Sequence, residues 1–129
     1  MRAVVFDWDG TLVDSLPAIL EANVEVLREF GVPFDATTYR SAYVPDWRHM
    51  YRRLGVPEDA IGAAGRRWLE LYREIEGLTP FPGVADALRR LSDTGVRMGL
   101  VTAGDRRVVE DQLTRFGLSE LLTVHVCGD

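Results

Sequence analysis

Short apolar runs and longer stretches with helical spacing alternate along the chain. Residues 1–6 form an apolar run that stops at the polar sequence DWDGT, residues 7–11, which predicts a buried strand leading into a loop. Two more strands are expected at residues 96–101 and 123–127, and each is preceded by a helical pattern. Strands separated by helices form βαβ units, so the sequence predicts an α/β fold with a parallel sheet and right-handed crossovers.

The middle of the chain has helical periodicity throughout and no segment with the pattern of a strand. Ser15 is expected to cap a helix that ends at Gly31. From residue 35 to 77 the pattern stays helical, with breaks at Pro45 and at residues 55–57, and the rigid sequence TPFPG then leads back to the strand-containing part. The predicted domains are a Rossmann-like core, residues 1–13 and 80–129, and an α-helical insertion, residues 14–79.

Composition and charge narrow the class of protein. Of 129 residues, 47% are hydrophobic and 27% are charged, as in ordinary globular domains. No apolar run approaches the roughly 20 residues that cross a bilayer, and a net charge of −5 disfavours general binding to nucleic acid or to an anionic membrane. The single cysteine, Cys127, cannot form an internal disulfide and fits a reducing compartment, so we expect a cytoplasmic protein.

Several polar residues follow the predicted strands, where ligands bind in parallel sheets. Asp7, Asp9, Thr11 and Thr102 all fall at carboxyl ends of strands, so they are candidates for one site. Asp7 could act as a nucleophile or metal ligand and Asp9 as a general acid and base, while Gly10 lets the backbone approach an oxyanion. Two aspartates one residue apart also suit a polar turn, and the pair alone does not decide between these interpretations.

The longer sequence VVFDWDGTLVDS, residues 4–15, resembles the first motif of the haloacid dehalogenase-like (HAD) hydrolase superfamily. Asp14-Ser15 leading into a helix resembles the start of the helical cap in the phosphoglycolate phosphatase-like branch. Residues 79–84 resemble the return from cap to core, and residues 95–102 resemble the strand of the second motif. The resemblance therefore spans the whole chain.

The resemblance implies a phosphatase site. Asp7 would form an aspartyl-phosphate, Asp9 would protonate the leaving group and then activate water, and Thr102 would hold a phosphoryl oxygen. The resemblance also implies a Mg²⁺ ion held by the carboxylate of Asp7 and the backbone carbonyl of Asp9, in keeping with its preference for oxygen ligands. The expected backbone N–H donors to the phosphate are those of Gly10, Thr11 and Ala103.

Asp9 also distinguishes between branches of the superfamily. Dehalogenases expel halide, which needs no proton, and they lack an acid at this position, so Asp9 favours a phosphatase. The predicted substrate is a small phosphorylated metabolite, which the sequence does not identify. The alternatives are a non-catalytic binding or interaction module that keeps the aspartate pocket, a phosphomutase and a haloacid dehalogenase.

Three basic residues outside the motifs are weaker candidates. Arg48, in the helical insertion, is a candidate contact to the substrate. His49 and His125 are single histidines, better explained by a polar helix face and by a buried strand than by ligand roles.

Two motifs of the superfamily find no match in the chain. The third motif is a lysine beyond the third strand and the fourth is an acidic cluster after a fourth strand, whereas this sequence has 15 arginines and no lysine. We therefore expect a C-terminally truncated form that lacks the fourth and fifth strands and has weak or no activity alone. Arg106 and Arg107 are candidates to supply the missing positive charge.

The strand order that the resemblance implies, without the fourth and fifth strands, would make residues 1–6 an edge strand. An apolar edge strand presents unpaired backbone groups to other chains. The sequence therefore predicts a dimer, or pairing with a partner chain, through the first strand.

Overall fold

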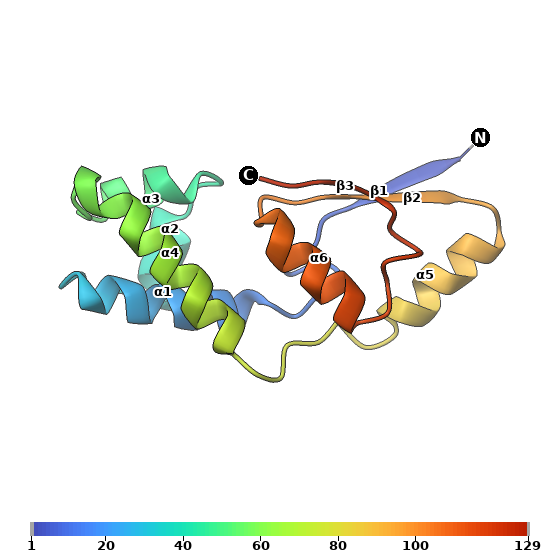
Figure 1. The fold of residues 1–129 in the computed structure, drawn as a ribbon, viewed down its shortest axis with the longest axis horizontal. Coiled ribbons are helices and arrows are strands. Elements are labelled where there is room, and N and C mark those ends of the chain that lie inside the picture. The colour runs from blue at the N-terminus through green and yellow to red at the C-terminus, as the bar shows by residue number, and fades with distance from the viewer. Residues whose placement is uncertain (1, 129) are drawn as a thin grey trace. The chain divides into compact units, whose positions relative to one another are not determined.

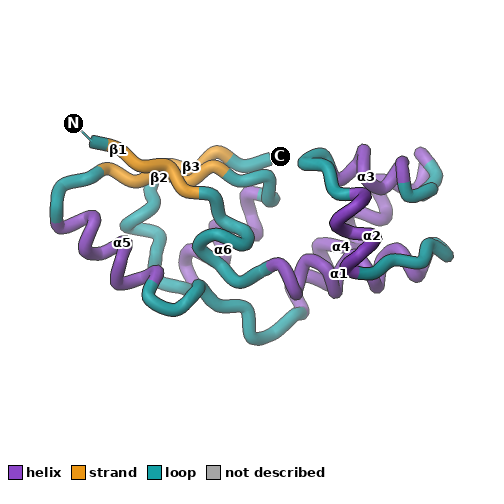
Figure 2. The backbone as a smooth tube through the Cα atoms, turned by 180° about the vertical axis from the view of Figure 1, so that it is seen from behind, coloured by secondary structure: helices purple, strands orange, loops and turns teal. Residues whose placement is uncertain are grey.

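The structure, a computed structural model, describes residues 2–128, and the chain divides into two compact units. Met1–Ser15 with Leu78–Asp129 forms the first unit, and Leu16–Gly77 forms the second. Figure 2 shows that the strands belong to the first unit alone. The predicted class, an α/β fold with a parallel sheet and an inserted helical segment, is confirmed.

A parallel three-stranded sheet organises the first unit. β1 (Ala3–Phe6), β2 (Arg97–Val101) and β3 (Val124–Val126) lie side by side in that order. Helix α5 (Val84–Asp93) precedes β2, and helix α6 (Arg106–Arg115) connects β2 with β3. Both helices lie on the same side of the sheet (Figure 1).

Side chains of the sheet alternate between a buried and an exposed face, as the pleat of a strand requires. In β2, Met98 and Leu100 are buried, whereas Val101 is 49% exposed. Val126 lies opposite Val101, and both it and Val5 are more than half exposed. Among the described residues, the sheet therefore buries one face beneath α5 and α6 and leaves valines on the other.

The second unit consists of helices joined by short loops and contains no strand. Its elements are α1 (Leu16–Glu29), α2 (Ala36–Ala42), α3 (Trp47–Arg53), the 3₁₀ helix η1 (Glu58–Ala60) and α4 (Ile61–Glu74). Asp35 and Asp46 begin α2 and α3 by accepting backbone N–H bonds on their side chains. The buried hydroxyl of Tyr51 donates to Asn23 Oδ1 at 2.7 Å, which satisfies both polar groups within an apolar core. No helix in residues 2–128 is long and apolar enough to cross a membrane.

We expect the valine face and the β1 edge to associate with another chain, because within residues 2–128 β1 pairs only with β2. Sedimentation velocity over a concentration series should show association of the wild-type chain. Val5→Lys should raise the dissociation constant at least about tenfold, equivalent to about 1.4 kcal/mol. Tyr43→Lys, an exposed change in the second unit, is the matched control and should have no effect. A wild-type chain that stays monomeric at all concentrations would contradict the prediction.

Candidate active site

Two neighbouring strands of the first unit end at the same level. β1 pairs with β2 so that Phe6 lies opposite Leu100. Asp7 follows β1 directly and Thr102 follows β2 directly, so both lie at the carboxyl edge of the sheet. This edge is where ligands bind in open parallel sheets, because the loops there project away from the packed strands.

The loop after β1 turns tightly around the carbonyl oxygen of Trp8. This oxygen accepts the N–H groups of Thr11, Leu12 and Val13 at 3.2, 3.0 and 3.1 Å. Gly10 has a φ of 74°, which glycine adopts without steric strain, and its N–H donates to Val13 at 2.9 Å. Backbone hydrogen bonds therefore hold the two aspartates on either side of Trp8.

Two of the three predicted phosphate-binding N–H groups are used inside this loop. The N–H of Gly10 donates to the Val13 carbonyl, and that of Thr11 donates to the Trp8 carbonyl. A phosphoryl oxygen would have to share or replace these bonds. Ala103 is exposed on the loop after β2. The roles of Gly10, Thr11 and Ala103 toward phosphate stay predictions.

Asp9 is the better shielded of the two carboxylates. The hydroxyl of Ser15, which is fully buried, donates to Asp9 Oδ1 at 2.6 Å. Burial raises the pKa of Asp9, and the charge of Asp7 raises it further, whereas the Ser15 hydrogen bond lowers it; the net pKa is raised. An aspartate that keeps its proton to higher pH is suited to donate that proton to a leaving group.

Thr102 lies close to the second oxygen of Asp9. The Thr102 hydroxyl oxygen accepts the N–H of Gly104 at 3.0 Å, and Thr102 itself is buried. A Cβ atom on Gly104 would lie 3.3 Å from Thr102 Oγ1 and 3.4 Å from Asp9 Oδ2. The two oxygens therefore lie no farther apart than the sum of these distances, so the side chains of Asp9 and Thr102 are neighbours at this edge of the sheet.

Asp7 is the exposed member of the pair. The Thr11 hydroxyl donates to Asp7 Oδ2 over a long distance of 3.4 Å. The carboxylate of Asp7 is therefore only weakly hydrogen-bonded within the protein, and it is exposed to solvent. Exposure of this kind suits a group that must reach an incoming phosphate or a hydrated cation.

The last residue of β3 and the segment that follows it are hydrogen-bonded to the loop that carries Thr102. The N–H of Thr102 donates to the Val126 carbonyl at 2.9 Å, and the N–H of Gly128 donates to the Gly104 carbonyl at 3.0 Å. A Cβ on Gly128 would lie only 2.3 Å from the carbonyl oxygen of Ala103. Only glycine fits this approach of backbone to backbone.

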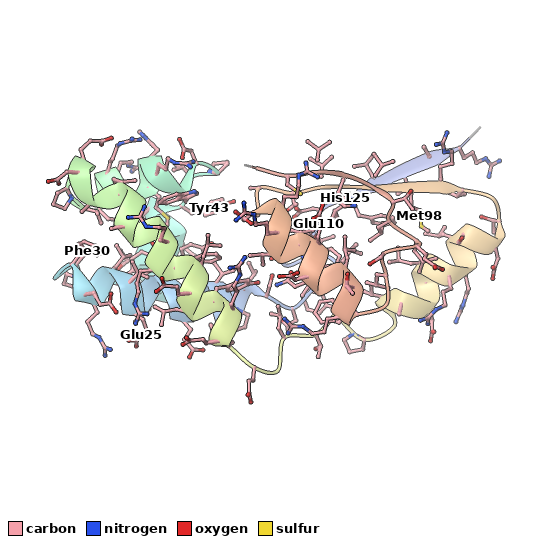
Figure 3. All side chains as sticks on the ribbon, in the orientation of Figure 1. Glu25, Phe30, Tyr43, Met98, Glu110 and His125 are labelled. Atoms are coloured by element: carbon pink, nitrogen blue, oxygen red, sulfur yellow. The ribbon has the colours of Figure 1, made fainter. Side chains whose placement is uncertain are left out.

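The arginines proposed as substitutes for a lysine are placed differently from one another. Arg106 forms an ion pair with Glu110 at 3.8 Å, and Arg107 is exposed. Glu110 also lies 3.9 Å from His125 Nδ1, and Figure 3 shows these two side chains near each other. Part of the Arg106 charge is therefore balanced locally by an acid, and a role for either arginine in the site stays a prediction.

Arg48 and His49 lie in the second unit, at the start of α3. The guanidinium of Arg48 stacks over the ring of Trp47 with its Cζ 4.7 Å from the centroid, a cation–π contact. His49 is exposed, and its backbone N–H donates to the capping Asp46. A contact of Arg48 with the substrate stays a prediction.

Three residues belong to this site that the motifs did not indicate as site residues. The sequence pattern predicts Ser15 as a helix cap, yet its hydroxyl binds Asp9. Gly104 and Gly128 have no side chain that could react or bind. Their role is to let the backbone come close to neighbouring residues, and only the structure shows this. No periodicity in the sequence could have found them.

Comparison with known proteins identifies the family. The family model described as haloacid dehalogenase-like hydrolase matches residues 4–129. The chain belongs to this family. It is 35% identical to the phosphoglycolate phosphatase of Synechococcus elongatus, over 99% of this chain and 61% of that protein. It is 33% identical to phosphoglycolate phosphatase 1 of Pseudomonas aeruginosa, over 99% of this chain and 51% of that protein.

Solved structures show the same fold. A haloacid dehalogenase-like hydrolase of Streptococcus pneumoniae superposes with a TM-score of 0.81 at 26% identity, over 100% of this chain and 62% of that one. CbbY of Rhodobacter sphaeroides, solved in complex with phosphate, gives a TM-score of 0.82 at 22% identity, over 100% and 64%. This chain thus spans about half to two thirds of the length of the relatives named here.

Neutralising Asp9 should stabilise the fold in a pH-dependent way. Because the pKa of Asp9 is raised above its ordinary 3.8, ionising it costs folding free energy, and this cost grows as pH rises from 3.8 through the raised pKa. Asp9→Asn keeps an oxygen for the Ser15 hydroxyl, so the variant should be more stable than wild type at pH 7 and lose this advantage below pH 3.8. Urea denaturation at both pH values measures the difference. The exposed Asp7→Asn should stay within about 0.5 kcal/mol of wild type, and an Asp9→Asn variant less stable at pH 7 would refute the prediction.

A side chain at residue 128 should loosen the Thr102 loop. Gly128→Ala forces a methyl group against the Ala103 backbone and should lower the free energy of unfolding by about 1–3 kcal/mol. Gly62→Ala is the matched control, because a Cβ there meets only the flexible end of Arg66 at 3.6 Å within a helix, and it should not destabilise the chain. Denaturation followed by circular dichroism compares them. Equal stability of the two variants would show that the close approach has no energetic weight.

Proposed function

We propose that this chain carries the catalytic aspartates of a phosphatase that hydrolyses a small phosphomonoester through an aspartyl-phosphate on Asp7. The observation that carries the proposal is the Asp9 carboxyl, with its raised pKa, between the Ser15 hydroxyl and the Thr102 loop, one residue from the exposed Asp7. Relatives named phosphoglycolate phosphatase make phosphoglycolate the first natural substrate to test. A cytoplasmic location stays a prediction.

Each carboxyl group has one task in the proposed reaction. An Asp7 oxygen attacks phosphorus while the bond from phosphorus to the ester oxygen breaks, and protonated Asp9 gives its proton to the departing alkoxide. Asp9, now ionised, takes a proton from a water molecule that attacks the phosphoryl group on Asp7. This second step releases inorganic phosphate and restores both carboxyl groups. The Thr102 oxygen accepts the Gly104 N–H, so its own proton can be directed to a phosphoryl oxygen.

The carboxylate and carbonyl oxygens at Asp7 and Asp9 are of the ligand type that a magnesium ion prefers. Mg²⁺ keeps several waters and binds through one or two carboxylates together with substrate phosphate, so it does not need a cage of protein ligands. Within residues 2–128 there is no group of three or more His, Cys, Asp or Glu side chains that could hold a metal ion. The exposed carboxylate of Asp7 and the backbone carbonyl of Asp9 would hold the ion. When bound, it would offset the repulsion between a carboxylate and a phosphate dianion.

Turnover by the 129-residue polypeptide alone is proposed to be slow. Its sequence contains no lysine, and Arg106 is paired with Glu110. Loss of one preorganised group that stabilises charge in the transition state typically costs about 10²- to 10³-fold in rate. Asp7 is present, but the chain supplies less positive charge near it than a site with a lysine would.

Trapping the covalent intermediate tests the proposal without requiring fast turnover. The chain is mixed with p-nitrophenyl phosphate and Mg²⁺, quenched in acid and analysed by intact mass. Because p-nitrophenolate leaves without a proton, Asp9→Asn should still acquire one phosphoryl group but lose it about 10²- to 10⁴-fold more slowly than wild type, and so accumulate it. Peptide mapping should place the group on Asp7.

Asp7→Asn is the control for this experiment and should acquire no phosphoryl group. Phosphorylation that persists in Asp7→Asn would exclude Asp7 as the nucleophile. Absence of phosphorylation in both wild type and Asp9→Asn would favour the non-catalytic alternative. Robust steady-state turnover by wild type would show that Arg106, Arg107 or a second chain supplies the missing charge.

A further inference from the structure

We propose that Gln112 is a positioning residue that fixes the two catalytic aspartates through Trp8. The Trp8 indole N–H donates to Gln112 Oε1 at 2.6 Å, joining the loop after β1 to helix α6. Trp8 is 0% exposed and Gln112 is 3% exposed, so the bond is shielded from water. The inference rests on the proposed roles of Asp7 and Asp9.

The position of Trp8 in the chain makes its anchoring relevant to the site. It is the residue between the two aspartates, and its carbonyl accepts the three N–H bonds that shape the loop. Its ring also packs against Phe116 just after α6, with centroids 6.3 Å apart. The buried indole therefore ties the backbone between the two aspartates to Gln112 and Phe116.

Helix α6 is tied to both halves of the site. Its capping residue Asp105 follows directly after Gly104, whose N–H donates to the Thr102 hydroxyl oxygen and where an added Cβ would meet both Thr102 and Asp9. Two turns farther along the same helix, Gln112 binds Trp8. Because a helix is rigid over this length, the bond sets how the aspartate loop lies relative to the Thr102 loop.

Packing alone does not require this pair. An apolar side chain at either position could fill a core without burying a polar group, whereas a buried indole N–H needs an acceptor and a buried amide needs partners. A hydrogen bond in a shielded environment is directional, and it favours one orientation of the ring over others that pack equally well. Orientation is therefore what the pair adds to the fold.

The test is a cycle of three variants with two readouts. Gln112→Met removes the acceptor at nearly constant shape, Trp8→Phe removes the donor, and the double variant removes both. For each, urea denaturation measures stability, and quenched-flow intact mass measures the rate and half-saturation of Asp7 phosphorylation by p-nitrophenyl phosphate. Leu113→Val is the matched control, since Leu113 is equally buried on α6 and does not take part in the bond.

We expect the single variants to lower the maximal phosphorylation rate about 10- to 100-fold with little change in half-saturation, as small displacements of reacting groups do. The double variant should be more stable than the two single losses together predict, because the indole donor and its acceptor are both gone, but it should not regain the rate. Recovery of both stability and rate in the double variant, or a loss of rate in Leu113→Val equal to that in Gln112→Met, would overturn the inference and leave a packing role only.

A readout without chemistry separates failure of this inference from failure of the proposed function. In ¹H–¹⁵N spectra of the wild type, the indole N–H of Trp8 should exchange with solvent more slowly than those of Trp47 and Trp68. Gln112→Met should shift the backbone amide signals of Asp7 and Asp9. If the wild type is never phosphorylated but these shifts occur, the proposed function fails and the positioning contact stands; unchanged amide signals would refute the contact itself.

Discussion

The parallel pairing of β1 with β2 is the interaction on which the site depends. A single aspartate or threonine side chain does not form a site by itself, and the two strands that carry these residues lie far apart in the sequence. Their register, with Phe6 opposite Leu100, makes both strands end together and puts the following residues at one edge. The carboxylates meet the Thr102 loop because the sheet is parallel; an antiparallel arrangement would send the two loops to opposite ends.

A second constraint closes the first unit where the chain leaves it and returns. The N–H of Asp14 donates to the Thr79 carbonyl at 3.0 Å, and the N–H of Phe81 donates to the Leu12 carbonyl at 3.0 Å. Exit and return are therefore hydrogen-bonded to each other, so the strand-bearing unit does not rely on the length of the insertion. Ser15, the last residue before the insertion, binds Asp9 and links the exit point directly to the acid of the site.

The sequence predicted the helices and strands and the residues that follow strand ends. It said much less about the side-chain contacts that hold these residues in place. Apolar periodicity located all three strands, although the third is shorter than expected at Val124–Val126, and Met1 of the first lies outside the described residues. The approach of Asp9 to Thr102 followed from the rule for parallel strand ends. The bond from Trp8 to Gln112 joins residues in different elements through side chains, and no spacing rule encodes such a pairing. Ser15 shows the same limit, since one hydroxyl can cap a helix or bind a neighbouring loop.

The short first strand has a consequence for the lifetime of the site. β1 has four residues and, within residues 2–128, bonds to a neighbour on one side only, while Asp7 follows it directly. Native proteins open in local steps, and an exposed edge segment detaches at a lower free energy than the buried strand beside it. The proposed nucleophile is thus attached to an edge strand of the sheet, and not to the central strand β2. The free energy of local opening of β1 determines how much of the time Asp7 is correctly placed. The free energy of global unfolding is only an upper limit on that local free energy.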